Sequence, residues 1–246
     1  MANENGVWIM HGVKPTDKKC LHSVAELEAC VKEMGFLPLF ANEIKGFSLE
    51  ERTTARSWWS GDIEHDPWLW RTLAGQSGEI TYGKFFNKKT GFISKEWFPC
   101  FANYRRDGYD FDALWGDELA SHRQKKIMDL FAAGQEYCSP ELKRRAGFGR
   151  GGEKNFEGTI TGLQTQAYLC ISGFHRRQNK EGEEYGWHIA AYSMPESLWG
   201  YDYIAAAYEE APARSWQRIR EHIRRLFPRA DERAIMKVMG IKKINC

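Results

Sequence analysis

The chain has 246 residues, of which 42% are hydrophobic and 14% aromatic, and its formal net charge is only +2. This composition predicts a folded protein of one or two domains and excludes a largely disordered chain. The six cysteines are far apart and form no Cys-x-x-Cys pair, which argues against a zinc site and a compact disulfide framework and indicates a reducing cytoplasm. We expect a cytoplasmic protein, because the chain shows no secretion signal and no apolar run long enough to span a membrane.

Residues 1–20 are predicted to form an N-terminal arm, and residues 21–112 a unit of helices and a hairpin. Helix starts are indicated by a capping box at Ser23, a second one at Ser48, and Asp66 followed by proline. A hairpin is predicted from Ile80 to Phe86 and Phe92 to Ser94. Three helices followed by a hairpin is the element order of a winged helix, so we interpret this unit as a divergent one.

A short helix is predicted from Lys95 to Phe101, and residues 103–110 are interpreted as the connection to the next unit. Arg105 and Arg106 lie in this connection and add a basic pair to the clusters expected of a nucleic-acid-binding protein. The connection leads into residues 113–195, which repeat the same element order and are predicted to form a winged-helix domain.

In this domain the first helix is expected from Glu118 to Ala133. Ser139 followed by proline begins a second, short helix that ends at Gly147. A third helix starts at Asn155, because four apolar residues recur at helical spacing: Phe156, Ile160, Leu163 and Ala167. Two strands follow, Tyr168 to Phe174 and Tyr185 to Tyr192.

The third helix would be the recognition helix, with Glu157, Thr161 and Gln164 facing bases in the major groove. Arg150 and Lys154 precede it and are expected to touch phosphate, because the amide groups of a helix N-terminus attract anions. The loop between the two strands is interpreted as the wing, with a turn at Gly182 and five polar or basic residues: His175, Arg176, Arg177, Asn179 and Lys180. Arg176, Arg177 and Lys180 are predicted to contact DNA.

Residues 196–246 are predicted to form a basic helical tail. Its apolar stripe is Trp216, Ile219, Ile223 and Leu226, a last helix begins at Asp231, and Gly240 ends it. Its arginines are expected to follow the DNA backbone, although a basic amphipathic helix is also compatible with a plain solvated face. The fold class is therefore α+β and predominantly helical, with winged-helix units, short hairpins and a helical tail.

Several of these stretches resemble the AlkZ and YcaQ type of bacterial DNA glycosylases, which unhook crosslinks and excise bulky alkyl adducts. The similar stretches are Asp66 to Arg71, Tyr82 to Phe85, Phe92 to Ser94, and Leu163 to Gln166. The catalytic signature of that family is a Gln-x-Gln pair, and Gln164-Thr165-Gln166 has this form. The resemblance implies DNA binding and assigns a catalytic role to Gln164 and Gln166.

An alkylated purine already carries positive charge and leaves easily, so neutral amides suffice to place water and favour an oxocarbenium-like transition state. Residues 164 and 166 project about 200° apart on a helix, so they converge only if the helix ends between them. The alternative is an ordinary recognition-helix side chain at Gln164, with Gln166 capping or pairing with backbone. No cofactor or metal is expected, because the two carboxylate clusters, at 62–66 and 107–112, lack calcium-loop spacing.

The sequence thus predicts a protein that binds double-stranded DNA, with monofunctional DNA glycosylase activity as one hypothesis. A non-catalytic regulator or architectural DNA-binding protein is the alternative, and a winged helix used only for protein contacts is a third. The sequence does not indicate an oligomeric state.

Overall fold

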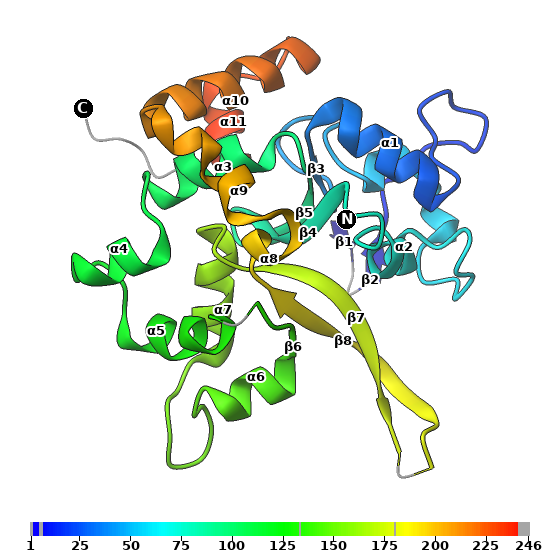
Figure 1. Ribbon diagram of the computed structural model, residues 1–246. Coiled ribbons are helices and arrows are strands. Elements are labelled where there is room, and N and C mark those ends of the chain that lie inside the picture. The colour runs from blue at the N-terminus through cyan, green and yellow to red at the C-terminus, as the bar shows by residue number, and fades with distance from the viewer. Residues whose placement is uncertain (1, 5–6, 133, 180, 241–246) are drawn as a thin grey trace. The chain divides into compact units, whose positions relative to one another are not determined.

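The computed structural model describes residues 2–4, 7–132, 134–179 and 181–240 (Figure 1). By backbone contacts the chain divides into unit 1, Met1–Phe98 with Trp216–Cys246, and unit 2, Pro99–Ser215. The domain boundaries predicted from sequence, at 20/21, 112/113 and 195/196, do not coincide with the borders of these two units. The predicted domain division stays a prediction. Both units mix helices with antiparallel strands, so the α+β class is confirmed.

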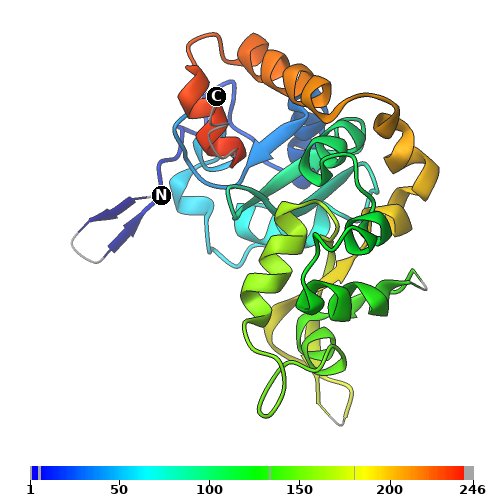
Figure 2. The same ribbon diagram turned by 90° about the vertical axis from the view of Figure 1, so that its left-hand side faces the viewer.

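Unit 1 is built on three antiparallel strands in the order β3-β5-β4. Helix α1 packs on these strands and buries Leu27 and Val31 against them. A separate two-stranded hairpin, β1–β2, lies apart from those strands (Figure 2). The elements of unit 1 are β1 (Ala2–Glu4), β2 (Val7–Ile9), α1 (Val24–Met34), β3 (Phe36–Pro38), η1 (Glu50–Arg52), η2 (Ala55–Ser57), α2 (Pro67–Leu73), β4 (Ile80–Phe86), β5 (Lys89–Ser94) and α11 (Glu232–Met239).

The capping signals in unit 1 mark real helix ends. Ser23 accepts a hydrogen bond from the Glu26 amide and begins α1, and Gly35 ends it with a φ of 73°. Asp66 caps α2 through the Trp68 amide. The predicted hairpin at 80–94 is present as β4 and β5.

The helix predicted from Ser48 towards Trp59 is wrong. Ser48 does form its capping contacts with Glu51, yet only two short 3-10 turns follow, η1 and η2. The reason is Glu50, which is completely buried and accepts hydrogen bonds from the amides of His11 and Ala41. These distant contacts fix the segment in a form that a local pattern does not reveal.

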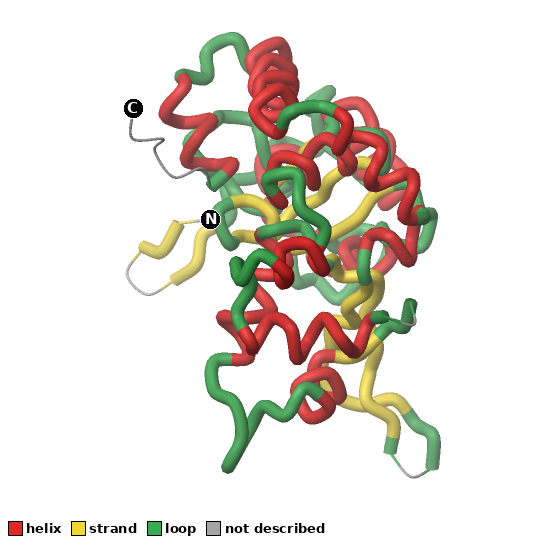
Figure 3. The backbone as a smooth tube through the Cα atoms, turned by 60° about the vertical axis from the view of Figure 1, so that its left-hand side comes forward, coloured by secondary structure: helices red, strands yellow, loops and turns green. Residues whose placement is uncertain are grey.

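Unit 2 contains three antiparallel strands in the order β7-β8-β6, together with several short helices (Figure 3). Its elements are α4 (Phe111–Gly116), α5 (His122–Met128), η3 (Asp129–Phe131), β6 (Tyr137–Cys138), α6 (Ser139–Arg145), α7 (Phe156–Thr165), β7 (Cys170–Gln178), β8 (Glu184–Ser193), α8 (Pro195–Trp199), α9 (Tyr201–Ala205) and η4 (Ala206–Glu209). The boundaries between the units fall inside α3 (Phe98–Arg106) and α10 (Pro212–Leu226).

Three expectations about unit 2 need correction. The helix predicted from 118 begins only at His122, because Glu118 has a φ of 59°, Leu119 is 60% exposed and the capping box sits at Ser121. The short helix expected at 95–101 is instead α3, which starts at Phe98 and runs through the supposed connection to Arg106. His175, Arg176 and Arg177 belong to strand β7 and not to the loop.

The C-terminal tail is mostly helical as predicted over its described part, which ends at residue 240. Ile219 and Ile223 are completely buried, Asp231 caps α11 through the Ala234 amide, and Gly240 ends it with a φ of 71°. Within the described ranges, no helix is both long and apolar enough to cross a membrane.

Candidate nucleic-acid interface

Helix α7 is the central element of the candidate interface. It follows a glycine-rich loop in which Gly147, Gly149 and Gly151 all have positive φ, and it begins after Asn155, itself left-handed with a φ of 66°. Phe156, Ile160 and Leu163 are at most 3% exposed, so the predicted apolar face of this helix is confirmed. On the opposite face Glu157 is exposed, and Thr161 and Thr165 are half-buried.

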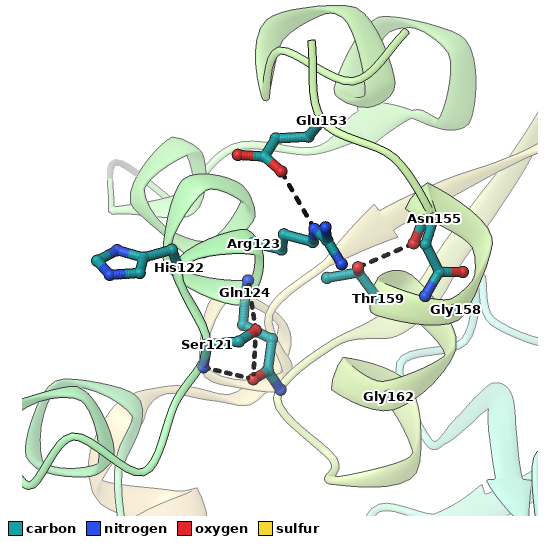
Figure 4. A pocket seen from close by; sticks show the side chains of 9 residues that line it. All are labelled: Ser121, His122, Arg123, Gln124, Glu153, Asn155, Gly158, Thr159 and Gly162. Carbon is teal, nitrogen blue, oxygen red and sulfur yellow. Dashed lines mark hydrogen bonds and ion pairs between the residues drawn. The ribbon is translucent and has the colours of Figure 1, made fainter.

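A groove of about 510 Å³ runs between α5 and α7 (Figure 4). The start of α5 forms one wall with Ser121, Arg123 and Gln124, and α7 forms the other with Thr159 and Gly162. No atom lies within 4 Å of where a Cβ of Gly162 would sit, so this glycine keeps the groove wide. The groove is therefore a polar depression beside the helix predicted to read DNA.

Glu153 neutralises two cations at the rim of this groove. Its carboxylate binds Lys126 at 2.7 Å and Arg123 at 3.1 Å. Hydrogen bonds from Lys126 and Arg123 hold the pKa of Glu153 below its ordinary value. These two cations are thus less available to phosphate than Arg150 and Lys154 on the neighbouring loop.

Gln124 joins the start of α5 to the end of α7. Its side-chain oxygen accepts hydrogen bonds from the Ser121 amide and hydroxyl, which completes a capping box. Its amide nitrogen donates to Oε1 of Gln166 at 2.6 Å. Sequence reasoning missed this residue, although the spacing of Ser121 and Gln124 before an apolar helix was a visible signal.

Gln164 and Gln166 occupy different environments. Gln164 is completely buried and its amide donates to the Ile160 carbonyl at 3.2 Å, one turn earlier in α7. Gln166 is half-buried and is the C-cap of α7, which ends between the two glutamines. The catalytic role of this pair stays a prediction.

Burial sorts the other residues predicted to contact DNA. Arg150 and Lys154 are exposed in the loop before α7, and Glu157 is exposed on α7 itself. Arg176 and Arg177 are exposed on β7. Thr161 is half-buried on α7. Lys180 lies outside the described residues. Gln164 is buried and therefore does not lie on the outward face of α7 with Glu157. Thr165, which is half-buried, lies closer to that face.

The β7–β8 hairpin carries negative charge that the sequence reasoning overlooked. Three exposed glutamates lie at or next to its tip, Glu181, Glu183 and Glu184. The side-chain oxygen of Asn179 accepts hydrogen bonds from the backbone amides of Glu181 at 3.1 Å and Glu183 at 2.8 Å, which fixes this turn. Arg176 and Arg177 are further down the stem, so any contact with phosphate would come from the stem rather than from the tip.

Trp187 on β8 is 89% exposed, which is unusual for a tryptophan. Tyr185, two residues earlier, is 50% exposed and pairs in register with Arg177. The hairpin therefore offers flat aromatic surface next to a cation.

Arg106 is not available to a nucleic acid, although it was predicted to belong to a basic cluster. Its side chain is only 2% exposed and pairs with Glu196 at the start of α8. Among the described residues, no group of three or more histidine, cysteine, aspartate or glutamate side chains is placed to hold a metal ion.

Comparison with curated proteins and with solved structures gave no match. A family described as AlkZ related matches residues 21–240, which is most of the chain. The match confirms the resemblance inferred from the stretches around Asp66, Tyr82 and Leu163, and it suggests DNA as a partner. The chain belongs to the AlkZ-related family.

Proposed function

We propose that unit 2 binds double-stranded DNA as a winged helix, with α7 in the major groove. The observation that carries the proposal is the strand pairing around the three helices. β6 lies in sequence between α5 and α6, and it pairs with β8, the second strand of the hairpin that follows α7. A helix, a short strand, two helices and a hairpin joined in this way form a scaffold that presents its third helix to DNA.

The surface of this scaffold fits a polyanion at two places. Arg150 and Lys154 precede the N-terminus of α7, where backbone amides also favour phosphate. Arg176 and Arg177 lie on the exposed stem of the hairpin. Family membership supports the same partner. We confine the proposal to unit 2, because 3-10 turns replace the expected second helix of unit 1.

The test is binding of the full chain to a short fluorescent duplex, measured by anisotropy at several salt concentrations. Replacing Arg176 and Arg177 together by alanine should weaken binding and reduce the slope of log K against log salt by up to about 2, roughly one unit for each phosphate that is no longer neutralised. The Arg150→Ala, Lys154→Ala variant should act in the same direction.

The matched control replaces Lys14 and Lys18, two exposed lysines of unit 1, by alanine and therefore removes the same charge. Its salt slope should equal that of the wild type. If both double variants of unit 2 bind like this control, the winged-helix interface is refuted. Lesion-independent binding with a steep salt dependence would favour a regulator or an architectural protein over an enzyme.

Excision of alkylated bases is the second candidate function, and family membership supports it. On this hypothesis Gln166 is the better placed of the two glutamines, because it is half-buried whereas Gln164 is inside the core. Incubation with a duplex bearing an alkylated purine, followed by alkali, should cleave the strand at the lesion.

Activity should be lost in the Gln164→Ala, Gln166→Ala variant and retained in a Gln217→Ala control, since Gln217 is an exposed residue of α10 whose side-chain amide donates to its neighbour Glu221. Absence of lesion-dependent cleavage by the wild-type protein would reject the enzymatic hypothesis and leave the DNA-binding proposal standing.

A further inference from the structure

The outer part of the β7–β8 hairpin has no core beneath it. Residues 175–177, 179 and 181–187 are all exposed, so both faces of the two strands are open to solvent there. This part extends away from the helices of unit 2 (Figures 1 and 3). Side chains at these positions do not contribute to packing within the unit, so a large apolar residue among them needs another reason.

Trp187 is such a residue. At 89% it is more exposed than any other large hydrophobic residue of the described chain. Tyr185, which is 50% exposed, precedes it by two residues. Aromatic residues gain much stability from burial, so two neighbouring rings that are left in water indicate a surface that is covered by a partner.

A β-bulge places Trp187 on this surface. Between the in-register pairs 177 with 185 and 175 with 189, three residues of β8 face a single residue of β7. Trp187 is the middle residue of the three, and the residue opposite is Arg176. Gly186 begins the bulge with a φ of 76°, a conformation that favours glycine. Bulges redirect side chains and occur often beside functional sites, so the backbone is shaped to hold this ring outward.

The charges around the two rings indicate the kind of partner. Arg177 lies across from Tyr185, and Arg176 lies across from Trp187. The core of a protein–protein interface is depleted of charge, whereas these rings stand next to exposed cations. Proteins that bind unpaired nucleic acid combine the same two features, because bases stack on aromatic faces and cations neutralise the phosphates. The glutamates of the tip repel phosphate, which leaves the stem as the place for the strand.

We propose that Trp187 stacks on an unpaired base of a DNA strand, with Tyr185 beside it and with Arg176 and Arg177 on the adjacent phosphates. The proposal rests on the proposed DNA-binding function for its partner. It adds a contact that a fully paired duplex does not offer, because paired bases are already stacked on one another and have to leave the helix before a side chain can cover them.

Anisotropy of the full chain with two labelled oligonucleotides tests the proposal. One is an oligodeoxyadenylate, and the other is an abasic strand of the same length, which carries the same phosphates without bases. The wild type should bind the oligodeoxyadenylate at least about fivefold more tightly, which is the smallest factor that stacking of one base on an aromatic side chain provides. Equal affinity for the two strands overturns the proposal.

Three variants locate the stacking surface. Trp187→Ala should remove the preference for the strand with bases, and Trp187→Phe should keep most of it because an aromatic face remains. Neither change touches the core, since Trp187 is 89% exposed. The matched control is Trp59→Ala, which removes a tryptophan of unit 1 that is 48% exposed and should bind as the wild type. If Trp187→Ala retains the preference, or Trp59→Ala loses it to the same extent, the hairpin does not hold the base.

Two further measurements separate this proposal from its alternatives. Trp187→Ala should bind a fully paired duplex with the affinity and salt slope of the wild type, so a failed duplex test refutes the winged-helix interface, whereas a failed comparison of the two single strands refutes the stacking role. Sedimentation of the chain without DNA tests a second copy as the occupant. A wild-type dimer that Trp187→Ala converts into a monomer would assign the ring to a contact between copies and would overturn the proposal.

Discussion

The buried ion pair of unit 2 gives the sharpest test of how this fold is held together. Arg106 is 3% exposed and connects α3 to three other places: Glu196 on α8, Tyr208 on η4 and the Ala167 carbonyl just after α7. Although burial disfavours the charged form, Glu196 and Tyr208 hold the pKa of Arg106 above its ordinary value. The guanidinium is therefore charged in the folded protein at any physiological pH.

Arg106→Met removes the cation and leaves the Glu196 carboxylate buried without compensation. Breaking a buried pair from one side costs about 3–5 kcal/mol of unfolding free energy. Arg145→Met is the control, because it breaks an exposed ion pair with Glu141, of the kind worth at most about 1 kcal/mol. Urea unfolding followed by far-UV circular dichroism measures both variants, with attention to separate transitions of the two units.

The double variant Arg106→Met, Glu196→Leu separates charge from packing. It should recover about 2 kcal/mol relative to the summed effects of the two single variants, because no uncompensated charge then remains inside. An Arg106→Met variant no less stable than Arg145→Met would show that the pair is not buried in solution, and the reasoning about unit 2 would fail with it.

Three further predictions concern other buried positions. Gln164→Ala should lower the free energy of unfolding by about 1–3 kcal/mol, because it removes a buried amide that donates to the helix backbone, and urea unfolding measures this decrease. Gly35→Ala should be more destabilising than an ordinary glycine substitution, by thermal unfolding, because its φ is 73° and a Cβ would lie 2.6 Å from Cδ1 of Trp97. Burial, helped by Arg225, holds the pKa of His222 below its ordinary value of 6.5. As the pH falls, His222 is therefore protonated in the unfolded chain before it is protonated in the folded protein. The free energy of unfolding should be highest above about pH 6.5 and decrease as the pH drops below it. A His222→Phe variant should show a smaller decrease in pH-dependent urea unfolding.

The elements that could be predicted from sequence are those whose ends are fixed locally. Ser23 and Asp66 cap helices through side-chain contacts two or three residues away, and the 80–94 hairpin closes on itself. The predictions failed where a contact with a residue far away in the sequence determines the local structure. Glu50 binds backbone 39 residues away, and Arg106 finds its carboxylate 90 residues later, so neither the absence of a helix at 48–59 nor the burial of an arginine has a local signature.

Much of the candidate site could also be predicted from local sequence. The exposure of Lys154 and Glu157 at the start of α7 followed from the apolar spacing of the helix. The burial of Gln164 could have been predicted from that spacing as well, because positions 160, 163, 164 and 167 form one stripe of a helix. The acidic tip of the hairpin needed only a count of glutamates between residues 180 and 185.

The end of α7 decides what the Gln-Thr-Gln stretch can do. Since the helix stops at Thr165, Gln164 stays on the apolar stripe, whereas Gln166 turns out of it and meets Gln124 from α5. A water held by both Gln164 and Gln166 would have to reach the core of unit 2, whereas one held by Gln124 and Gln166 would need only the groove that Gln124 lines. If the chain excises bases, the decrease in activity should therefore be larger for Gln124→Leu with Gln166→Ala than for Gln164→Ala measured at equal folded fraction. The opposite order would place the chemistry in the core and require unit 2 to open before it reacts.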